Sequence, residues 1–96
     1  SIPRQGYKVL KLSGQQLLEI VKFRSELETS FFKNYYRYID ESRINDLITA
    51  NMDFINCPEN DFEGRWRLNC EFHLKLFSFY ENHYAYKIME DSLNFQ

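Results

Sequence analysis

The chain has 96 residues, of which 44% are hydrophobic, 18% aromatic and 27% charged, and its formal net charge is −2. This length fits one domain, and this composition excludes a disordered chain. Three Gly and two Pro are too few for a turn-rich all-β fold, and two Cys are too few for a disulfide scaffold. No apolar run reaches the roughly 18–20 residues that span a bilayer, so we expect no membrane segment, and the low cysteine count favours a reducing cytoplasm.

Charge is distributed unevenly along the chain. Residues 1–24 carry five basic side chains and one acidic side chain, a net +4, whereas residues 25–96 carry seven basic and thirteen acidic side chains, a net −6. A basic N-terminal segment fits either a nucleic-acid contact or a solvated tail. The acidic remainder is not typical of a nucleic-acid-binding surface.

Residues 1–12 differ from the rest of the chain. Pro3 and Gly6 indicate a turn, and Tyr7 and Val9 alternate with polar residues as in a short strand. We therefore predict an extended N-terminal arm that leads into a helical domain.

The first helix is predicted to begin at a capping box, in which Ser13 and Gln16 each bond the backbone of the other. It is predicted to run to about Ile39. Its apolar positions recur at helical spacing, at Leu17, Ile20, Val21, Leu27, Phe31, Tyr35 and Tyr38.

Three further helices are predicted. The second is capped by Asp40 and ends at Cys57, because a residue before proline is disfavoured in helical geometry. The third is capped by Asn60 or Asp61 and stops at Asn82, a residue type that tolerates left-handed backbone. Their apolar stripes are Ile44, Leu47, Ile48, Met52 and Ile55 in the second helix, Phe62, Trp66, Phe72, Leu76, Phe77 and Tyr80 in the third, and Ala85, Ile88, Met89 and Leu93 in the fourth.

Four helices with short connections predict an all-α fold, an antiparallel helical bundle preceded by the extended arm. The last helix has no Gly or Pro terminator before Gln96. We therefore expect the sequence to be a fragment.

The first helix places a charge on its apolar face. Arg24 lies between Val21 and Leu27, and Glu28 follows one turn later. A charge in a core is costly unless it is paired or meets a ligand. Arg24 is therefore either a member of a buried pair with Glu28 or the partner of an anionic ligand, because guanidinium suits carboxylates.

The third helix carries a possible pair of metal ligands. Asn69 and His73 are four residues apart and share one face with Trp66 and Leu76. An amide oxygen and an imidazole nitrogen can hold one metal ion, but metal sites need at least four ligands. The alternative is a hydrogen-bonded core histidine. Phosphate loops, activated nucleophiles and paired carboxylates are missing, so we do not expect an enzyme.

The sequence resembles the GntR transcription regulators of the FadR subfamily through four motifs that occur in the family's order. These motifs are Pro-Arg-x-Gly-Tyr-x-Val at 3–9, Arg-x-x-Leu-Glu at 24–28, Asn-x-x-Phe-His at 69–73 and Asn82. Residues 1–12 resemble the end of the DNA-binding wing and the linker. Residues 13–96 are similar to the N-terminal part of the family's helical effector-binding and dimerisation domain, known as FCD.

The resemblance implies a homodimeric regulator that binds operator DNA through a winged helix preceding Ser1 and senses a small carboxylate or sugar acid. It implies that Arg24 faces the effector and that Asn69 and His73 are ligands of a divalent metal of the zinc or nickel kind. Asn in place of the family's more frequent Asp should weaken that metal site, and two further His ligands are expected beyond Gln96. The alternative function is a small helical protein–protein interaction module without a ligand site.

Overall fold

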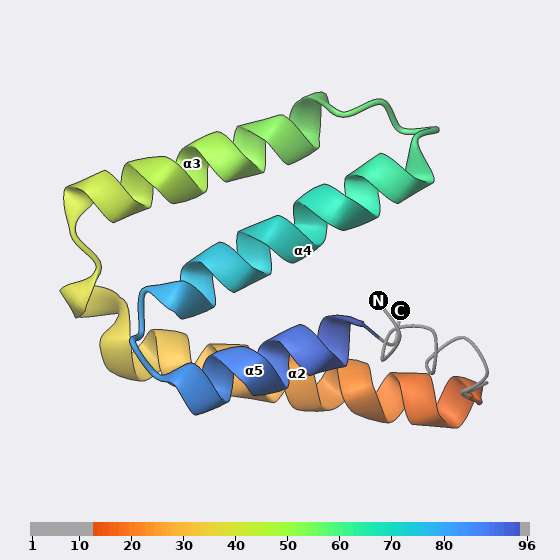
Figure 1. The fold of residues 1–96 in the computed structure, drawn as a ribbon, viewed down its shortest axis with the longest axis horizontal. Helices are drawn as coiled ribbons and strands as arrows, with labels where there is room; N and C mark the ends of the chain where they lie inside the picture. Colours follow the sequence, from red (N-terminus) through yellow and green to blue (C-terminus); the bar gives the residue numbers. More distant parts are fainter. Residues whose placement is uncertain (1–12, 95–96) are drawn as a thin grey trace.

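The structure is a computed structural model, and it describes residues 13–94. Over this range the chain is all-α (Figure 1). The helices are α2 (Gly14–Tyr35), the 3₁₀ turn η1 (Tyr36–Tyr38), α3 (Glu41–Asn56), α4 (Phe62–Ser78) and α5 (His83–Leu93). The extended arm and wing predicted for residues 1–12 lie outside the described residues. No helix in the described range is both long and apolar enough to cross a membrane.

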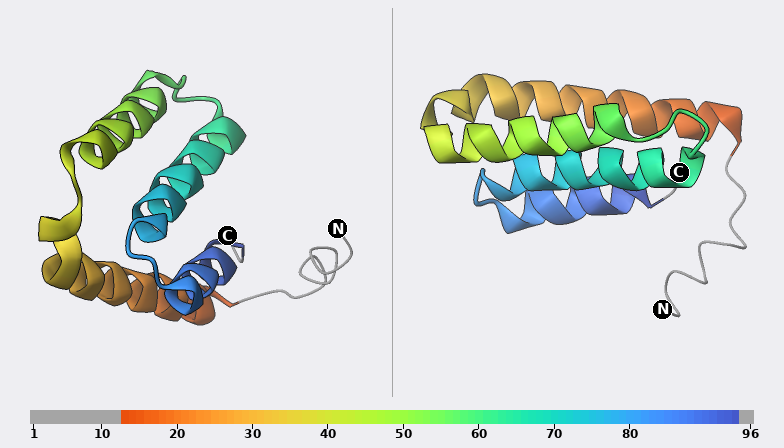
Figure 2. Two further views of the ribbon diagram at one scale, coloured as in Figure 1. Left: turned by 60° about the vertical axis from the view of Figure 1, so that its left-hand side comes forward. Right: turned by 90° about the horizontal axis from the view of Figure 1, so that it is seen from above.

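The helices form the predicted antiparallel arrangement, but the bundle is open on one side. Helix α4 packs against α3 and α5, and α5 also packs against α2. The Cα atoms of α2 stay more than 8 Å from those of α3 and α4 in the described structure. Figure 1 shows α4 between α3 and the pair formed by α2 and α5, and the left-hand view of Figure 2 shows α2 and α3 diverging from the η1 turn.

Local hydrogen bonds confirm most of the predicted helix starts. Ser13 and Gln16 form the full capping box of α2. The Asp40 carboxylate accepts from the Arg43 backbone N–H at 2.9 Å, and Asp61, the second of the two predicted candidates, caps α4. These side chains satisfy backbone donors that have no partner inside a helix.

The first helix is shorter than predicted. Helix α2 ends at Tyr35, the chain tightens into η1, and Ile39 is extended with φ −86° and ψ 113°. Ile39 is buried, and the next residue is the N-cap of α3. The prediction that this helix runs to Ile39 was wrong. The apolar spacing continues through η1 and Ile39, but these residues form the connection that leads into the N-cap of α3.

Asn82 has the opposite role from the one predicted. It does not terminate α4; its side-chain oxygen accepts from the Ala85 N–H at 2.9 Å and so caps the start of α5. The left-handed residue of this turn is Glu81, with φ 56°. Asn suits both roles, and sequence position alone does not separate them.

The core lies where α4 and α5 meet α2. Phe77 and Met89 are 1% and 0% exposed, and Ala85 and Leu93 complete the buried cluster. Partly buried side chains from these three helices and from the turn between α4 and α5 surround it: Leu27, Phe31, Trp66, Cys70, Leu74, Tyr80 and Tyr86.

The predicted apolar stripe of α3 is mostly uncovered. Leu47 is half-buried towards α4, whereas Ile44, Ile48, Met52 and Ile55 are exposed. Phe62, which we expected on the buried side of its helix, is 79% exposed. Periodicity identified the apolar face of α3, but α4 covers a neighbouring face.

Candidate functional site

A groove of about 630 Å³ runs between α2 and α4. This volume is within the range of small-molecule sites, although the groove is open to solvent on one side. Its lining is mainly apolar and consists of Glu28, Thr29, Phe32, Lys33, Tyr36, Phe72, His73 and Leu76. The groove could therefore contact the apolar part of a ligand over most of its surface and bind polar groups at a few positions.

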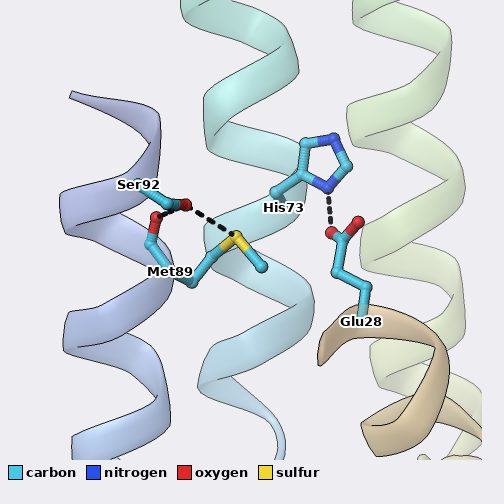
Figure 3. Close-up of polar contacts among 4 residues, drawn as sticks. All are labelled: Glu28, His73, Met89 and Ser92. Carbon is cyan, nitrogen blue, oxygen red and sulfur yellow. Dashed lines mark hydrogen bonds and ion pairs between the residues drawn. The ribbon is translucent and has the colours of Figure 1, made fainter. Parts of the chain in front are cut away.

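The main polar feature of the groove is a contact between Glu28 on α2 and His73 on α4. Figure 3 shows the two side chains pointing toward each other, with His73 Nδ1 against Glu28 Oε2. An ionised carboxylate only accepts hydrogen bonds, so Nδ1 carries the hydrogen in this contact. In the neutral imidazole, Nε2 then has a free lone pair.

This contact spans a gap that the backbones leave open. Because the Cα atoms of α2 and α4 are more than 8 Å apart, only long side chains bridge these helices in the described structure. These bridges include the Glu28–His73 contact and the ring contact between Phe31 and Phe77, with centroids 5.5 Å apart. The position of Glu28 thus depends on the side-chain packing of α2 as a whole.

Tyr80 lies beside this bridge. Its ring packs on Phe31, Tyr35 and Phe77, and its buried hydroxyl has no hydrogen-bond partner among the described residues. Burial, and next the negative charge of Glu28, raise the pKa of Tyr80 to about 12. Both effects disfavour a second negative charge next to the Glu28 carboxylate.

The predicted site residues do not all line the groove. His73 lines the groove, but Asn69 and Arg24 do not line it. Arg24 is half-buried and near Cys70: burial raises the pKa of the Cys70 thiol, and the Arg24 charge lowers it while Glu71 raises it. The structure brings Glu28 to His73, a contact that connects two of the four motifs identified in the sequence, those at 24–28 and 69–73.

A complete metal site is not found among residues 13–94. No group of three or more His, Cys, Asp or Glu side chains there has the geometry to hold a metal ion. Asn69 and His73 lie one turn apart on α4 and supply two donors. The described chain therefore offers half of a tetrahedral ligand set at most.

Several groove residues were not predicted from the sequence. Thr29 and Lys33 are one turn apart, as are Phe32 and Tyr36, so together they form one face of α2 and η1. That spacing was a detectable signal. The sequence analysis missed this spacing because Phe32 and Tyr36 are adjacent in sequence to Phe31 and Tyr35, which belong to the longer apolar stripe of the first helix.

Comparison with known proteins gives no further assignment. No protein-family model, no curated protein and no solved structure matches the chain. The site must be interpreted from its own residues.

Proposed function

We propose that this chain belongs to the ligand-sensing and dimerisation domain of a bacterial, cytoplasmic, metabolite-responsive transcription regulator. In this proposal the regulator is a homodimer and binds operator DNA through a winged helix on the N-terminal side of the domain. The observation that carries the proposal is the Glu28–His73 contact at the apolar groove, which joins two of the four motifs that resemble the FadR subfamily.

The orientation of His73 supports a role as a metal ligand. Histidines that bind metals commonly donate their other ring N–H to a carboxylate, which fixes the tautomer and the ring. Glu28 occupies that position here, leaving Nε2 for a divalent ion of the zinc or nickel kind. Asn69 is the proposed second ligand, and the remaining ligands must come from outside residues 13–94.

The proposed effector is a small carboxylate or sugar acid. Arg24 is the proposed partner of its carboxylate, and Glu28 keeps His73 in place. Binding regulates DNA affinity only if the effector binds two arrangements of the helices with different affinity. The gap between α2 and α4, bridged by side chains, is the proposed place where these arrangements differ.

A helical protein–protein interaction module is the second candidate function. The uncovered apolar face of α3 favours it. In that case Glu28–His73 is a structural contact, and Arg24 has a structural role.

Metal titration of the intact protein tests the proposal. By calorimetry with Ni²⁺ or Zn²⁺, His73→Ala should weaken binding at least tenfold, and Glu28→Gln should weaken it about 10–100-fold as expected for a supporting carboxylate. His83→Ala is the matched control, because His83 is exposed at the start of α5, and should bind like wild type. Equal affinity in His73→Ala and wild type would contradict the metal assignment.

Arg24→Met separates the two candidate functions. In a sensor it should abolish the response of DNA binding to a carboxylate effector. In an interaction module there is no effector response to lose, and Arg24→Met should act on stability alone, because removing one charged side chain from a partly buried site leaves any partner charge uncompensated. A retained effector response would remove Arg24 from the ligand site.

A further inference from the structure

The groove between α2 and α4 has aromatic walls. Three of its lining residues, Phe32, Tyr36 and Phe72, carry aromatic rings. Phe32 and Tyr36 stack on each other, with centroids 5.6 Å apart and an interplanar angle of 29°, and each is 49% exposed. Aromatic rings prefer offset-stacked or edge-to-face contacts with other rings. The groove can therefore contact a planar aromatic group on surfaces that the fold itself leaves uncovered.

The groove offers few partners for the hydroxyl groups of a ligand. Thr29 supplies a hydroxyl, but His73 already uses its Nδ1 on Glu28. A sugar acid carries several hydroxyls, and each hydroxyl that is placed against an apolar wall without a partner costs free energy. An apolar body has no such cost and gains from leaving water. Between a sugar acid and another small carboxylate, the lining favours an acid with an apolar body.

The two charged residues of the lining lie at opposite borders of the groove face of α2. At about 100° per residue, this face runs from Glu28 through Phe32 to Lys33. The Glu28 side chain is 21% exposed and meets His73 of α4, so it marks the inner border. Lys33 is exposed and marks the outer border. A ligand whose apolar part contacts the rings therefore reaches a cation at the solvent side and a carboxylate at the inner side.

Lys33 is available to a ligand. Among the residues that the structure describes, it forms no ion pair or hydrogen bond. Thr29 lies one turn before it on α2, so an ammonium and a hydroxyl can donate to one acceptor. The Glu28 carboxylate disfavours a second anion at the inner border. The positions of Lys33 and Glu28, and not the net charge of the lining, thus set the orientation of an acid.

We propose that the groove binds an aromatic monocarboxylate, with its rings against Phe32, Tyr36 and Phe72 and its carboxylate at Lys33. The carboxylate then lies at the outer border of the groove, and the ring system extends towards α4. This inference rests on the proposed function only for the role of the groove as a ligand site. It moves the carboxylate to Lys33 from Arg24, which does not line the groove.

Calorimetric titration of the intact protein tests the proposal. The probe is naphthoate, and EDTA is present so that a bound metal contributes nothing. Naphthamide has the same rings and a similar shape without the charge, and it should bind about fivefold more weakly, as expected for the loss of an exposed ion pair. Gluconate, whose body is hydroxylated, should bind about tenfold more weakly or worse.

Matched variants locate the carboxylate. Lys33→Met keeps the apolar stem of the side chain and removes the charge, so it should abolish the preference for naphthoate over naphthamide. Lys22→Met is the control, because Lys22 is also exposed on α2 but does not line the groove, and it should keep the preference.

A second pair of variants locates the rings. Phe32→Leu should weaken naphthoate binding about two- to tenfold, because it removes a ring contact. Phe23→Leu should bind like wild type, because Phe23 is similarly exposed (50% against 49%) but does not line the groove. All four substituted positions are exposed, so circular dichroism should show unchanged folding.

Three results would overturn the inference: no binding of naphthoate at millimolar concentration, equal affinity for naphthoate and naphthamide, or equal loss in Phe32→Leu and Phe23→Leu. Gluconate binding that is tighter than naphthoate binding and that Arg24→Met removes would also overturn it, while leaving the proposed function in place. Naphthoate binding as expected, in a protein that binds neither Ni²⁺ nor DNA, would support the inference and remove the proposed regulator function.

Discussion

The two sides of α4 differ in how their apolar residues are used. On the α5 side, Phe77, Met89 and Leu93 are buried against one another and against α2. On the α3 side, Ile48 and Met52 carry the same kind of apolar surface but remain exposed. The helices on the two sides, α3 and α5, are both amphipathic and both begin at a side-chain N-cap. The difference is therefore one of tertiary partners and not of local sequence.

Helix α3 is therefore held in place mainly by contacts at its two ends and by packing of one flank on α4. At its C-terminal end, Arg65 donates to the Cys57 carbonyl at 3.0 Å and lies over the Phe54 ring at 4.3 Å. At its N-terminal end, Arg43 lies over the Phe79 ring at 5.4 Å. Contacts of this kind fix the position of a helix without removing its other apolar face from water.

The largest expected effect is on the buried side. Met89→Ala should destabilise the fold by about 2–5 kcal/mol, because it removes a fully buried side chain and leaves a cavity. Met52→Ala is the matched control, because Met52 is 46% exposed, and it should stay within about 0.5 kcal/mol of wild type. Urea denaturation measures both. Similar losses in the two variants would mean that α3 is packed as tightly as α5.

Local features were predictable from the sequence, because a cap needs only its neighbours. Ser13, Asp40 and the Cys57–Pro58 stop are examples. The contact of Glu28 with His73 was not predictable, because the two residues are 45 positions apart and meet only through tertiary packing. Both residues belong to motifs that we identified, but helical spacing connects residues within one helix and cannot pair two helices.

The second prediction tests the connection between α3 and α4. The Asp61 carboxylate accepts from the Gly64 N–H at 3.0 Å, and a Cβ at Gly64 would lie 2.2 Å from Asp61 Oδ2. Gly64→Ala should therefore displace the cap, which costs about 0.5–2 kcal/mol, while Ala regains about 1 kcal/mol of helix propensity. We expect a net loss in thermal or urea denaturation, because the methyl group also needs space.

Two controls sharpen this prediction. Gly14→Ala should stabilise by about 0.4–1 kcal/mol, because its Cβ meets no atom within 4 Å. In an Asp61→Ala background, Gly64→Ala should become stabilising, because the clash has been removed. A gain from Gly64→Ala in the wild type would show that the cap does not hold this turn.

The third prediction concerns the turn that joins α4 to α5. Glu81 has φ 56°, a left-handed conformation that costs a non-glycine residue roughly 1–2 kcal/mol. Glu81→Gly should stabilise by up to about 1 kcal/mol, since the ion pair with Arg43, at 4.0 Å and largely exposed, contributes little. Glu81→Ala, which loses the same ion pair but keeps the strain, should not stabilise in the same denaturation experiment.

The smallest effect is confined to alkaline pH. The pKa of Tyr80 is about 12 in the fold and 10 for the free side chain, so between these values the folded state binds the proton more tightly. The contribution to stability is complete below pH 10 and is lost as pH rises towards 12. The Tyr80→Phe variant should lose less stability than wild type between pH 10 and 12. In wild type, the absorbance of the Tyr80 phenolate should form near pH 12, and the variant should lack this component. Formation of that absorbance near pH 10 would place Tyr80 in water.

Amide hydrogen exchange of wild-type protein at micromolar concentration tests most directly whether one side of α4 is closed and the other open. The account predicts that the amides of α3 exchange at least tenfold faster than those around Met89 in α5, because little buried surface resists their local opening. Equal protection of α3 and α5 would contradict the account that the apolar face of α3 is open to solvent.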